Sequence, residues 1–257
     1  MTYCVGLCLE QGLVMASDSR TNAGVDYISS FSKLHVLQPA PDRIFVLLAA
    51  GSLATTQNVL SRINRDLDRA ATEDSAGVNL LTVDYLFEAA AYIGQLNLAV
   101  QGDYGPALRS SGVSAEATFI LGGQIAGKPH GLYLIYPQGN AIAATAETPY
   151  LQIGESKFGK PVLDRFAVPS LPLEEGARLS LISLDGTARS NLTVAPPFEV
   201  ALYPRDKMAL SHRVKFGADA PELLALSHSW ETALARGFRE LPRFAWEPLA
   251  EGVKSPS

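Results

Sequence analysis

The first twenty residues, MTYCVGLCLEQGLVMASDSR, contain a hydroxyl, a carboxylate and a guanidinium that a β-hairpin would bring together. A hairpin closed by EQG and centred on Gln11 pairs residue 9 with 13, 4 with 18 and 2 with 20. Directly paired residues share one face of a sheet. This register predicts that Thr2, Asp18 and Arg20 point the same way, with an acid and a cation beside a terminal hydroxyl.

A hydroxyl needs a base to act as a nucleophile, and Thr2 can supply its own. No catalytic motif surrounds any of the four histidines, His35, His130, His212 and His228. Threonine is small enough for Met1 to be removed, which exposes an α-amine, a group that titrates at about 7.7 to 8.0. Such an amine can accept the hydroxyl proton during attack. We therefore expect the mature chain to begin at Thr2, with loss of Met1 as the activating step.

Other reaction classes lack their motifs. The segment GESKFG at 154–159 is close to a nucleophile elbow, but its second glycine comes one residue late for G-x-S-x-G. The sequence contains no H-E-x-x-H, no P-loop, no G-x-G-x-x-G and no cysteine pair with zinc-site spacing. We therefore expect neither a cofactor nor a bound metal.

The elements that would carry Thr2 and its neighbours begin with strands. TYCVGLCL, LVMAS and the wholly apolar IFVLLAA at 44–50 are typical of buried strands. Ser52 then fits the N-cap of an amphipathic helix whose apolar residues recur three or four positions apart. A second helix is predicted from Thr82 through YLFEAAAYIGQLNLAV.

The second half of the chain predicts strands, then helices with late strands between them. The strands are ATFILGG, GLYLIYP and AIAAT; helices follow around SKFGKPVLDRF and across LEEGARLSLISL. FEVALYP and HRVKF read as strands, and PELLALSHSWETALARGFREL as the last helix. This order favours an α+β domain with sheets inside and helices outside. We expect one domain over 1–240 and an extension over 241–257, with a disordered tail, EGVKSPS.

Composition excludes several classes of partner. The net charge is −5 and there is no cluster of Lys and Arg, so nucleic-acid binding is not expected. No apolar run is long enough to span a bilayer, and Glu10 interrupts the first one, which lacks the basic start of a signal peptide. Cys4 and Cys8 fit small buried thiols in a reducing compartment. We expect a soluble, cytoplasmic protein with no membrane partner.

Several pieces of the sequence share their order and spacing with a known family. Thr2 is followed by GLVMASDSR at Gly12–Arg20, by Lys33, and by Ala50–Ser52 before a helix. GGQIAGKPHGLYLIYPQGN is similar to the hairpin pattern G-G…G-x-x-L-Y-x-x-x-P-x-G. Together they resemble the proteasome-type β-subunits over roughly residues 2–205. GESKFGKPVLDR and the long C-terminal extension are most similar to the bacterial ancestral beta subunit (Anbu) branch.

The resemblance implies an N-terminal-nucleophile hydrolase fold, a four-layer αββα sandwich of two antiparallel sheets between helix layers. It also implies a self-compartmentalising threonine-type peptidase in which Thr2 is the nucleophile. Lys33 would assist proton transfer, and Asp18 would pair with Lys33 and hold it. The backbone N–H of Gly51 would form the oxyanion hole.

Further roles follow from the same resemblance. Substrate binding falls to four residues, Arg20, Thr21, Asn22 and Ser52. Asp185, which opens DGTARSN, would orient the terminal amine, with Ser190 as a further supporting hydroxyl. Where the family reads G-S-G-S this chain has GESK at 154–157, so the assisting serine is either replaced by Glu155 or shifted to Ser156.

The family self-associates, so we expect a homo-oligomer of about a dozen or more copies, as stacked rings or an open spiral. The apolar segments LFEAAAYIG and LISL are expected at its interfaces. Thr2 would face an interior chamber that admits unfolded protein or peptides; an ATPase partner is left open.

Two other functions stay open: an N-terminal-nucleophile amidohydrolase for a small amide, and a scaffold or binding assembly with weak or no hydrolysis. Each residue also has a plainer interpretation. Asp18 and Arg20 could form a solvated ion pair, Lys33 could lie at the surface, and Gly51 with Ser52 could be a turn and helix cap. Only the conjunction of these residues favours the peptidase.

Overall fold

The computed structural model describes residues 2–22, 28–72 and 77–247. The elements of these ranges follow in the order β1 (Tyr3–Leu9), β2 (Gly12–Ser17), β3 (Arg20–Asn22), β4 (Ile28–Ser30), β5 (Leu34–Ala40), β6 (Arg43–Gly51), α1 (Leu53–Ala70), α2 (Leu86–Ser110), β7 (Ala117–Ile125), β8 (Gly131–Ile135), β9 (Ala141–Ala143), β10 (Tyr150–Gly154), α3 (Lys160–Phe166), α4 (Leu173–Ser190), β11 (Phe198–Pro204), β12 (His212–Phe216) and α5 (Pro221–Arg239).

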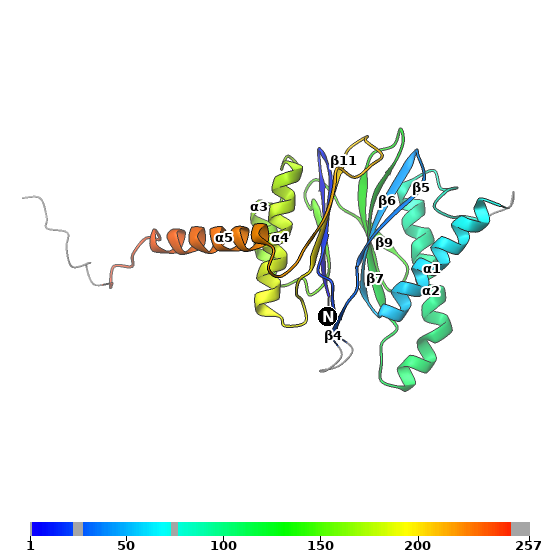
Figure 1. Cartoon of the computed structure of the whole chain (residues 1–257), viewed down its shortest axis with the longest axis horizontal. Coiled ribbons are helices and arrows are strands. Elements are labelled where there is room, and N and C mark those ends of the chain that lie inside the picture. The colour runs from blue at the N-terminus through cyan, green and yellow to red at the C-terminus, as the bar shows by residue number, and fades with distance from the viewer. Residues whose placement is uncertain (1, 23–27, 73–76, 248–257) are drawn as a thin grey trace, which may run out of the picture.

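The strands of the described residues form two five-stranded antiparallel sheets and a short ribbon. The first sheet has the order β10-β1-β2-β11-β12, and the second has the order β5-β6-β7-β8-β9. The ribbon pairs β3 with β4. The sheets face each other, with α3 and α4 outside the first and α1 and α2 outside the second (Figure 1). The predicted four-layer αββα sandwich is thereby confirmed.

Strand β6 shows why residues 44–50, IFVLLAA, are all apolar. Phe45, Leu47 and Ala49 pack in the core shared with α1 and α2. Val46 and Leu48, on the opposite face, pack in the core between the two sheets. Because successive side chains of a strand point to opposite faces, a strand in the middle of four layers buries both sets.

Two helices begin later than the sequence predicts. The second helix starts at Leu86 and not at Thr82. The Thr82 hydroxyl instead accepts a hydrogen bond from Asn79 N at 3.0 Å, inside a turn. Glu88 Oε2 accepts from Tyr85 N at 3.1 Å, which satisfies a free amide at the true start of α2. Similarly, α3 spans Lys160–Phe166 only, so the SKFG portion of the predicted helix lies outside it.

The apolar segments expected at subunit interfaces are mostly buried within one chain. Residues 181–184, the LISL segment, form part of α4 and are at most 7% exposed. In LFEAAAYIG, Phe87 is 55% exposed, but Leu86 and Ile93 are buried. The expectation that these segments need a partner was therefore wrong, because the two outer helix layers bury them against the sheets.

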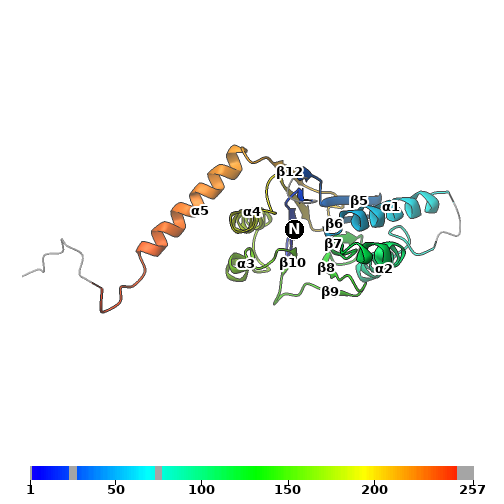
Figure 2. The ribbon, with the colours of Figure 1, turned by 90° about the horizontal axis from the view of Figure 1, so that it is seen from below.

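The last helix, α5, projects away from the four layers as an arm (Figures 1 and 2). Leu223 and Ser227 are its buried residues, both near its start. Leu224, Leu234 and Phe238 are 53 to 76% exposed. The tail predicted to be disordered lies outside the described residues. No helix of the described ranges has the length and apolar character needed to cross a membrane.

Candidate active site

The end of β10 fixes the backbone of Thr2. Strand β1 pairs with β10 so that Tyr3 lies opposite Gly154, and Glu155 N donates to Thr2 O at 2.8 Å. Gly154 has φ +82°, and a Cβ there would lie 1.8 Å from Thr2 O. Only glycine allows the two backbones to approach this closely. Gly154, the glycine of GESK, therefore allows the backbone of Thr2 to be fixed against the end of β10.

The β1–β2 hairpin has a register one residue away from the predicted one. Cys4 pairs with Ser17 and Leu9 with Gly12, so the turn contains two residues. Asp18 consequently lies opposite Tyr3: Asp18 Oδ1 accepts from Tyr3 N at 3.0 Å, and Asp18 N donates to Tyr3 O at 3.1 Å. The predicted pairing of 4 with 18 was wrong, yet Asp18 still enters the site through another partner.

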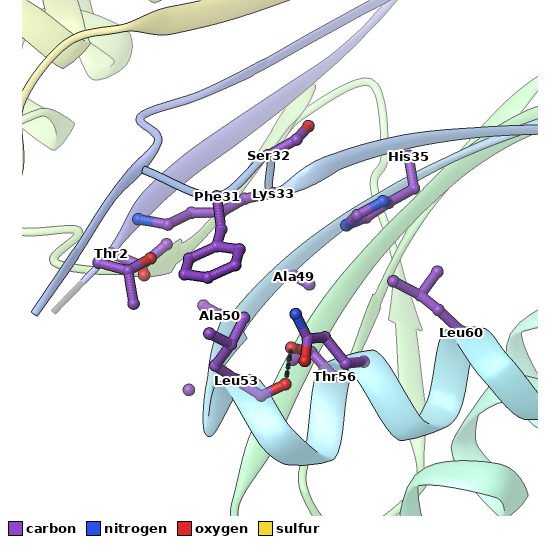
Figure 3. Close-up of a pocket in the computed structure, with 13 residues that line it drawn as sticks. Thr2, Phe31, Ser32, Lys33, His35, Ala49, Ala50, Leu53, Thr56 and Leu60 are labelled. Atoms are coloured by element: carbon purple, nitrogen blue, oxygen red, sulfur yellow. Dashed lines mark hydrogen bonds between the residues drawn. The ribbon is translucent and has the colours of Figure 1, made fainter. Parts of the chain in front are cut away.

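That partner is Lys33, just before β5. Its Nζ donates to Asp18 Oδ1 at 2.7 Å and to Arg20 O at 2.6 Å. The Lys33 side chain is 7% exposed and that of Asp18 is fully buried. The ammonium reaches toward Thr2 (Figure 3). Lys33 is thus a buried cation held by two oxygens, and the interpretation as a surface lysine is wrong.

Burial raises the pKa of the Asp18 carboxyl above its ordinary range, while the Lys33 ammonium and the Tyr3 N–H act in the opposite direction. The Lys33 ammonium therefore favours the charged form of the Asp18 carboxyl, which burial disfavours. Removing either would leave an uncompensated buried group.

Thr2 and Lys33 line a pocket of about 260 Å³ between the start of β1, the strands β5 and β6 and helix α1 (Figure 3). Its other lining residues are Thr21, Phe31, Ser32, His35, Ala49, Ala50, Gly51, Leu53, Thr56, Gln57 and Leu60. His35 lies at the end away from Thr2 (Figure 3). Burial lowers the pKa of His35, so its imidazole is uncharged at neutral pH. Among the described residues, the pocket thus has apolar walls, a few uncharged polar groups and one ammonium, that of Lys33, beside Thr2.

Gly51 lies on the wall of this pocket at the end of β6. Its φ is +104°, and a Cβ would lie 2.4 Å from Glu116 O. The backbone itself therefore demands glycine here, in addition to any approach by substrate. Ser52, the next residue, caps α1: its Oγ accepts from Thr55 N at 3.4 Å.

The four predicted substrate-binding residues are placed differently from one another. Thr21 lines the pocket. Arg20 contributes its carbonyl to Lys33, but its Nη1 donates to Leu192 O at 2.8 Å. Ser52 acts as a helix cap, and Asn22 lies in the ribbon strand β3.

Asp185 does not line the pocket with Thr2. Its Oδ2 accepts from Arg189 Nε and from Ser227 Oγ, each at 3.0 Å, in the contact between α4 and α5. Ser190 is exposed at the end of α4. Ser156 lies in the turn after β10, where its N donates to Gly154 O. The expectation that Asp185 orients the Thr2 amine is not supported, because this carboxylate has structural partners elsewhere.

A series of hydrogen-bonded polar residues lies beside Thr2, and only one of them, Glu155, was predicted from the sequence. Glu155, whose N–H binds Thr2 O, is 9% exposed, and its Oε2 accepts from Asn191 Nδ2 at 2.9 Å. Asn191 Oδ1 in turn accepts from Thr193 N at 3.0 Å. The sequence signal was the asparagine that ends α4, followed by threonine two residues later, a pattern typical of an Asx turn.

Solved structures similar to this chain share its fold from end to end. An Anbu Gly-1 mutant from Hyphomicrobium sp. strain MC1 is 40% identical, with a TM-score of 0.88, over 95% of this chain and 99% of that one. Anbu (ancestral beta-subunit) from Yersinia bercovieri is 41% identical, with a TM-score of 0.87, over 96% and 100%. The chain belongs to the Anbu family.

A third Anbu structure, described as the helical assembly of the Anbu complex from Pseudomonas aeruginosa, is 40% identical, with a TM-score of 0.86, over 98% of this chain and 100% of that one. No family model and no curated protein sequence matches the chain. The resemblance to the Anbu branch of the proteasome-type β-subunits is confirmed, and it includes α5, since the coverage extends past residues 2–205.

Proposed function

We propose that this Anbu chain is a threonine-type peptidase of the proteasome family, with Thr2 as the nucleophile. One observation carries the proposal: a buried ammonium, held by Asp18 and a backbone carbonyl, lies at the pocket that Thr2 lines. A buried lysine needs a reason to be retained, because its desolvation costs free energy. Assisting a neighbouring hydroxyl to lose its proton is such a reason.

In the first step, Thr2 Oγ1 attacks the carbonyl carbon of a peptide bond, and the hydroxyl proton passes to the free α-amine of Thr2. The Lys33 ammonium stabilises the negative charge that develops on Oγ1. The carbonyl oxygen becomes an oxyanion, which accepts a hydrogen bond from Gly51 N–H. The attack requires that nothing be bonded to the Thr2 amine, because an amide nitrogen is not a base.

In the second step, the tetrahedral intermediate collapses and the C–N bond breaks. The leaving amine takes the proton from the Thr2 α-ammonium, and the acyl group remains on Oγ1 as an ester. A water molecule, deprotonated by the same α-amine, then attacks the ester and releases the acid and the Thr2 hydroxyl. The chain thus needs no metal or cofactor for a complete cycle.

We further propose that the chain acts as a homo-oligomer. The related complex from Pseudomonas aeruginosa was solved as a helical assembly. Here α5 and the residues after it present a series of exposed apolar side chains, Leu224, Leu234, Phe238, Leu241, Phe244 and Trp246. Exposed apolar residues concentrated on one projecting arm are typical of an interaction surface. Assembly would enclose the Thr2 pockets and restrict access to peptides and unfolded chains.

Covalent labelling tests the function. Mature protein beginning at Thr2 is incubated with a peptide epoxyketone and analysed by intact mass, followed by peptide mapping. We expect one probe per chain, attached to Thr2, and no adduct on Thr2→Ala. An absence of labelling would favour a scaffold, and labelling without turnover of any peptide would favour a small-amide substrate.

A further inference from the structure

A second buried carboxylate lies behind the site. Glu199, on β11, is 4% exposed and pairs across the sheet with Ser17, the residue before Asp18. Its partners include two cations on the neighbouring strand β12: Lys215 Nζ lies 3.1 Å from Oε1, and Arg213 Nη2 lies 3.7 Å from Oε2. The mechanism above does not use Glu199, and a buried carboxylate in the middle of a sheet needs an explanation.

The carboxylate reaches from the first sheet to the residue ahead of Lys33. Ser32 Oγ donates to Glu199 Oε2 at 2.9 Å. Ser32 belongs to the connection that leads into β5, which is part of the second sheet. Glu199 thus ties the chain on the N-terminal side of Lys33 to β11.

Arg213 makes the matching contact on the other side of Lys33. Its Nη2 donates to Leu34 O at 3.2 Å while remaining near Glu199 Oε2. Lys215, although paired with Glu199, has no hydrogen bond to this segment in the described residues. Two contacts from the first sheet therefore hold the residues immediately before and after Lys33.

The geometry points to a positioning role: we propose that Glu199 and Arg213 clamp residues 32–34 from both sides and thereby aim the Lys33 ammonium at Thr2. This inference rests on the proposed function of Thr2. A lysine side chain has four rotatable bonds, so the position of its ammonium depends on where its backbone is fixed. A displacement of about 1 Å at a reacting group can lower a rate by up to about 10²-fold.

Glu199 can be replaced without leaving its two cations buried and unpaired. The side chains of Arg213 and Lys215 are 49% and 51% exposed, so both cations can turn to water when Glu199 is replaced. Glu199→Ala removes the carboxylate that accepts from Ser32 Oγ and leaves Leu34 O, also 2.9 Å away, as the hydroxyl's acceptor, so Ser32 is no longer tied to β11. Glu199→Gln keeps an oxygen acceptor of nearly the same shape and is the rescue variant. Lys215→Gln is the matched control, because it removes a charge from the same cluster without touching residues 32–34.

Two readouts are taken on the full-length mature protein. The first is the maximal rate of labelling by the peptide epoxyketone (kinact), measured separately from its binding constant (KI). We expect Glu199→Ala to lower kinact about 10-fold or more with KI within about 2-fold. Glu199→Gln should recover most of the rate, and Lys215→Gln should match the wild type.

The second readout is hydrogen exchange of the amides in residues 31–35, which should be faster in Glu199→Ala than in wild type or Lys215→Gln. Unchanged kinact in folded Glu199→Ala, or an equal loss in Lys215→Gln, would overturn the inference. If the wild type itself fails to label, the proposed function fails, and hydrogen exchange alone then decides the clamp: equal exchange in all variants would refute it.

Discussion

Lys33 and Asp18 form a buried ion pair at the wall of the pocket, with 2.7 Å between Nζ and Oδ1. Asp18 directly follows β2 of the first sheet, and Lys33 directly precedes β5 of the second. The pair therefore joins the two sheets at the pocket that contains Thr2. The ion pair can affect both the reactivity of Thr2 and the stability of the fold. The two effects can be measured separately, and each gives a prediction.

Substituting Lys33 should remove the chemistry. We expect Lys33→Ala to abolish labelling of Thr2, because no other cation lines the pocket in the described residues. Lys33→Arg should not restore it, since a planar guanidinium cannot occupy the space of a compact ammonium between Asp18 and Arg20 O. Labelling of Lys33→Ala at the wild-type rate, measured by intact mass, would show that the lysine is merely structural.

The stability of Lys33→Ala should depend on pH in a defined direction. Burial already raises the pKa of Asp18, and loss of the ammonium raises it further above the unfolded value of about 3.9. The folded state then binds the proton more tightly than the unfolded state, so its stability is present at low pH and lost as the pH rises. Relative to wild type, the free energy of unfolding should fall between about pH 4 and pH 7, by about 3 to 5 kcal/mol in full.

The control for this effect is the double variant Asp18→Asn with Lys33→Ala. An uncharged amide keeps an oxygen for Tyr3 N–H and removes the buried charge. Urea unfolding at pH 7 should find the double variant more stable than Lys33→Ala alone. Equal stability of the two would mean that the carboxylate is not buried in the way described.

A Cβ at Gly51 should harm both fold and function. With φ at +104° and Glu116 O within 2.4 Å of the added atom, Gly51→Ala should lower the free energy of unfolding by about 1 to 3 kcal/mol and slow labelling. The comparison is Gly186→Ala in α4, where an added Cβ meets nothing within 4 Å. That variant should be as stable as wild type or slightly more so. Denaturant unfolding and labelling rates are measured on both variants. Equal stability and equal labelling rates of Gly51→Ala and Gly186→Ala would contradict the prediction.

The layers of the fold could be predicted from the sequence because burial leaves a pattern. The strand over the apolar run 44–50, now part of β6, and the Ser52 cap of α1 were both predicted, since a strand buried on two faces and a helix start have local signatures. The hairpin register was not, because EQG does not reveal whether the turn contains two or three residues. Asp18 belongs to the site because it binds Lys33. This contact joins residues next to two different sheets, so no local sequence pattern predicts it.

Asp185 shows the limit of reading a motif along the chain. The residue begins DGTARSN as a turn would, but it lies inside α4 and binds Arg189 and Ser227. Asn191, six positions later, is the residue that contacts Glu155 beside Thr2. The two residues lie more than one turn of helix apart and have different partners, which the linear sequence does not reveal.

Assembly can be measured directly. The exposed apolar residues of α5 lead us to expect sedimentation at micromolar concentration to show a complex much larger than a dimer. Leu234→Glu with Phe238→Glu should weaken it, because a charge costs free energy when it is buried at an interface. The same pair of substitutions leaves the four layers untouched, so circular dichroism should be unchanged. A wild-type protein that sediments as a monomer would rule out the assembly.

The central claim is that Thr2 attacks with its own amine as the base, and one measurement tests it most directly. Two forms of the chain are compared by intact mass after incubation with the peptide epoxyketone: one that begins at Thr2, and one with residues fixed ahead of Thr2. Both keep every side chain of the pocket, and Thr2→Ser and Thr2→Ala of the processed form show whether the hydroxyl is used. We expect the processed form to be labelled at Thr2, Thr2→Ser to retain some labelling, and the extended form to be inert. Labelling of the extended form as fast as the processed one would contradict the account, because an amide nitrogen cannot accept the proton.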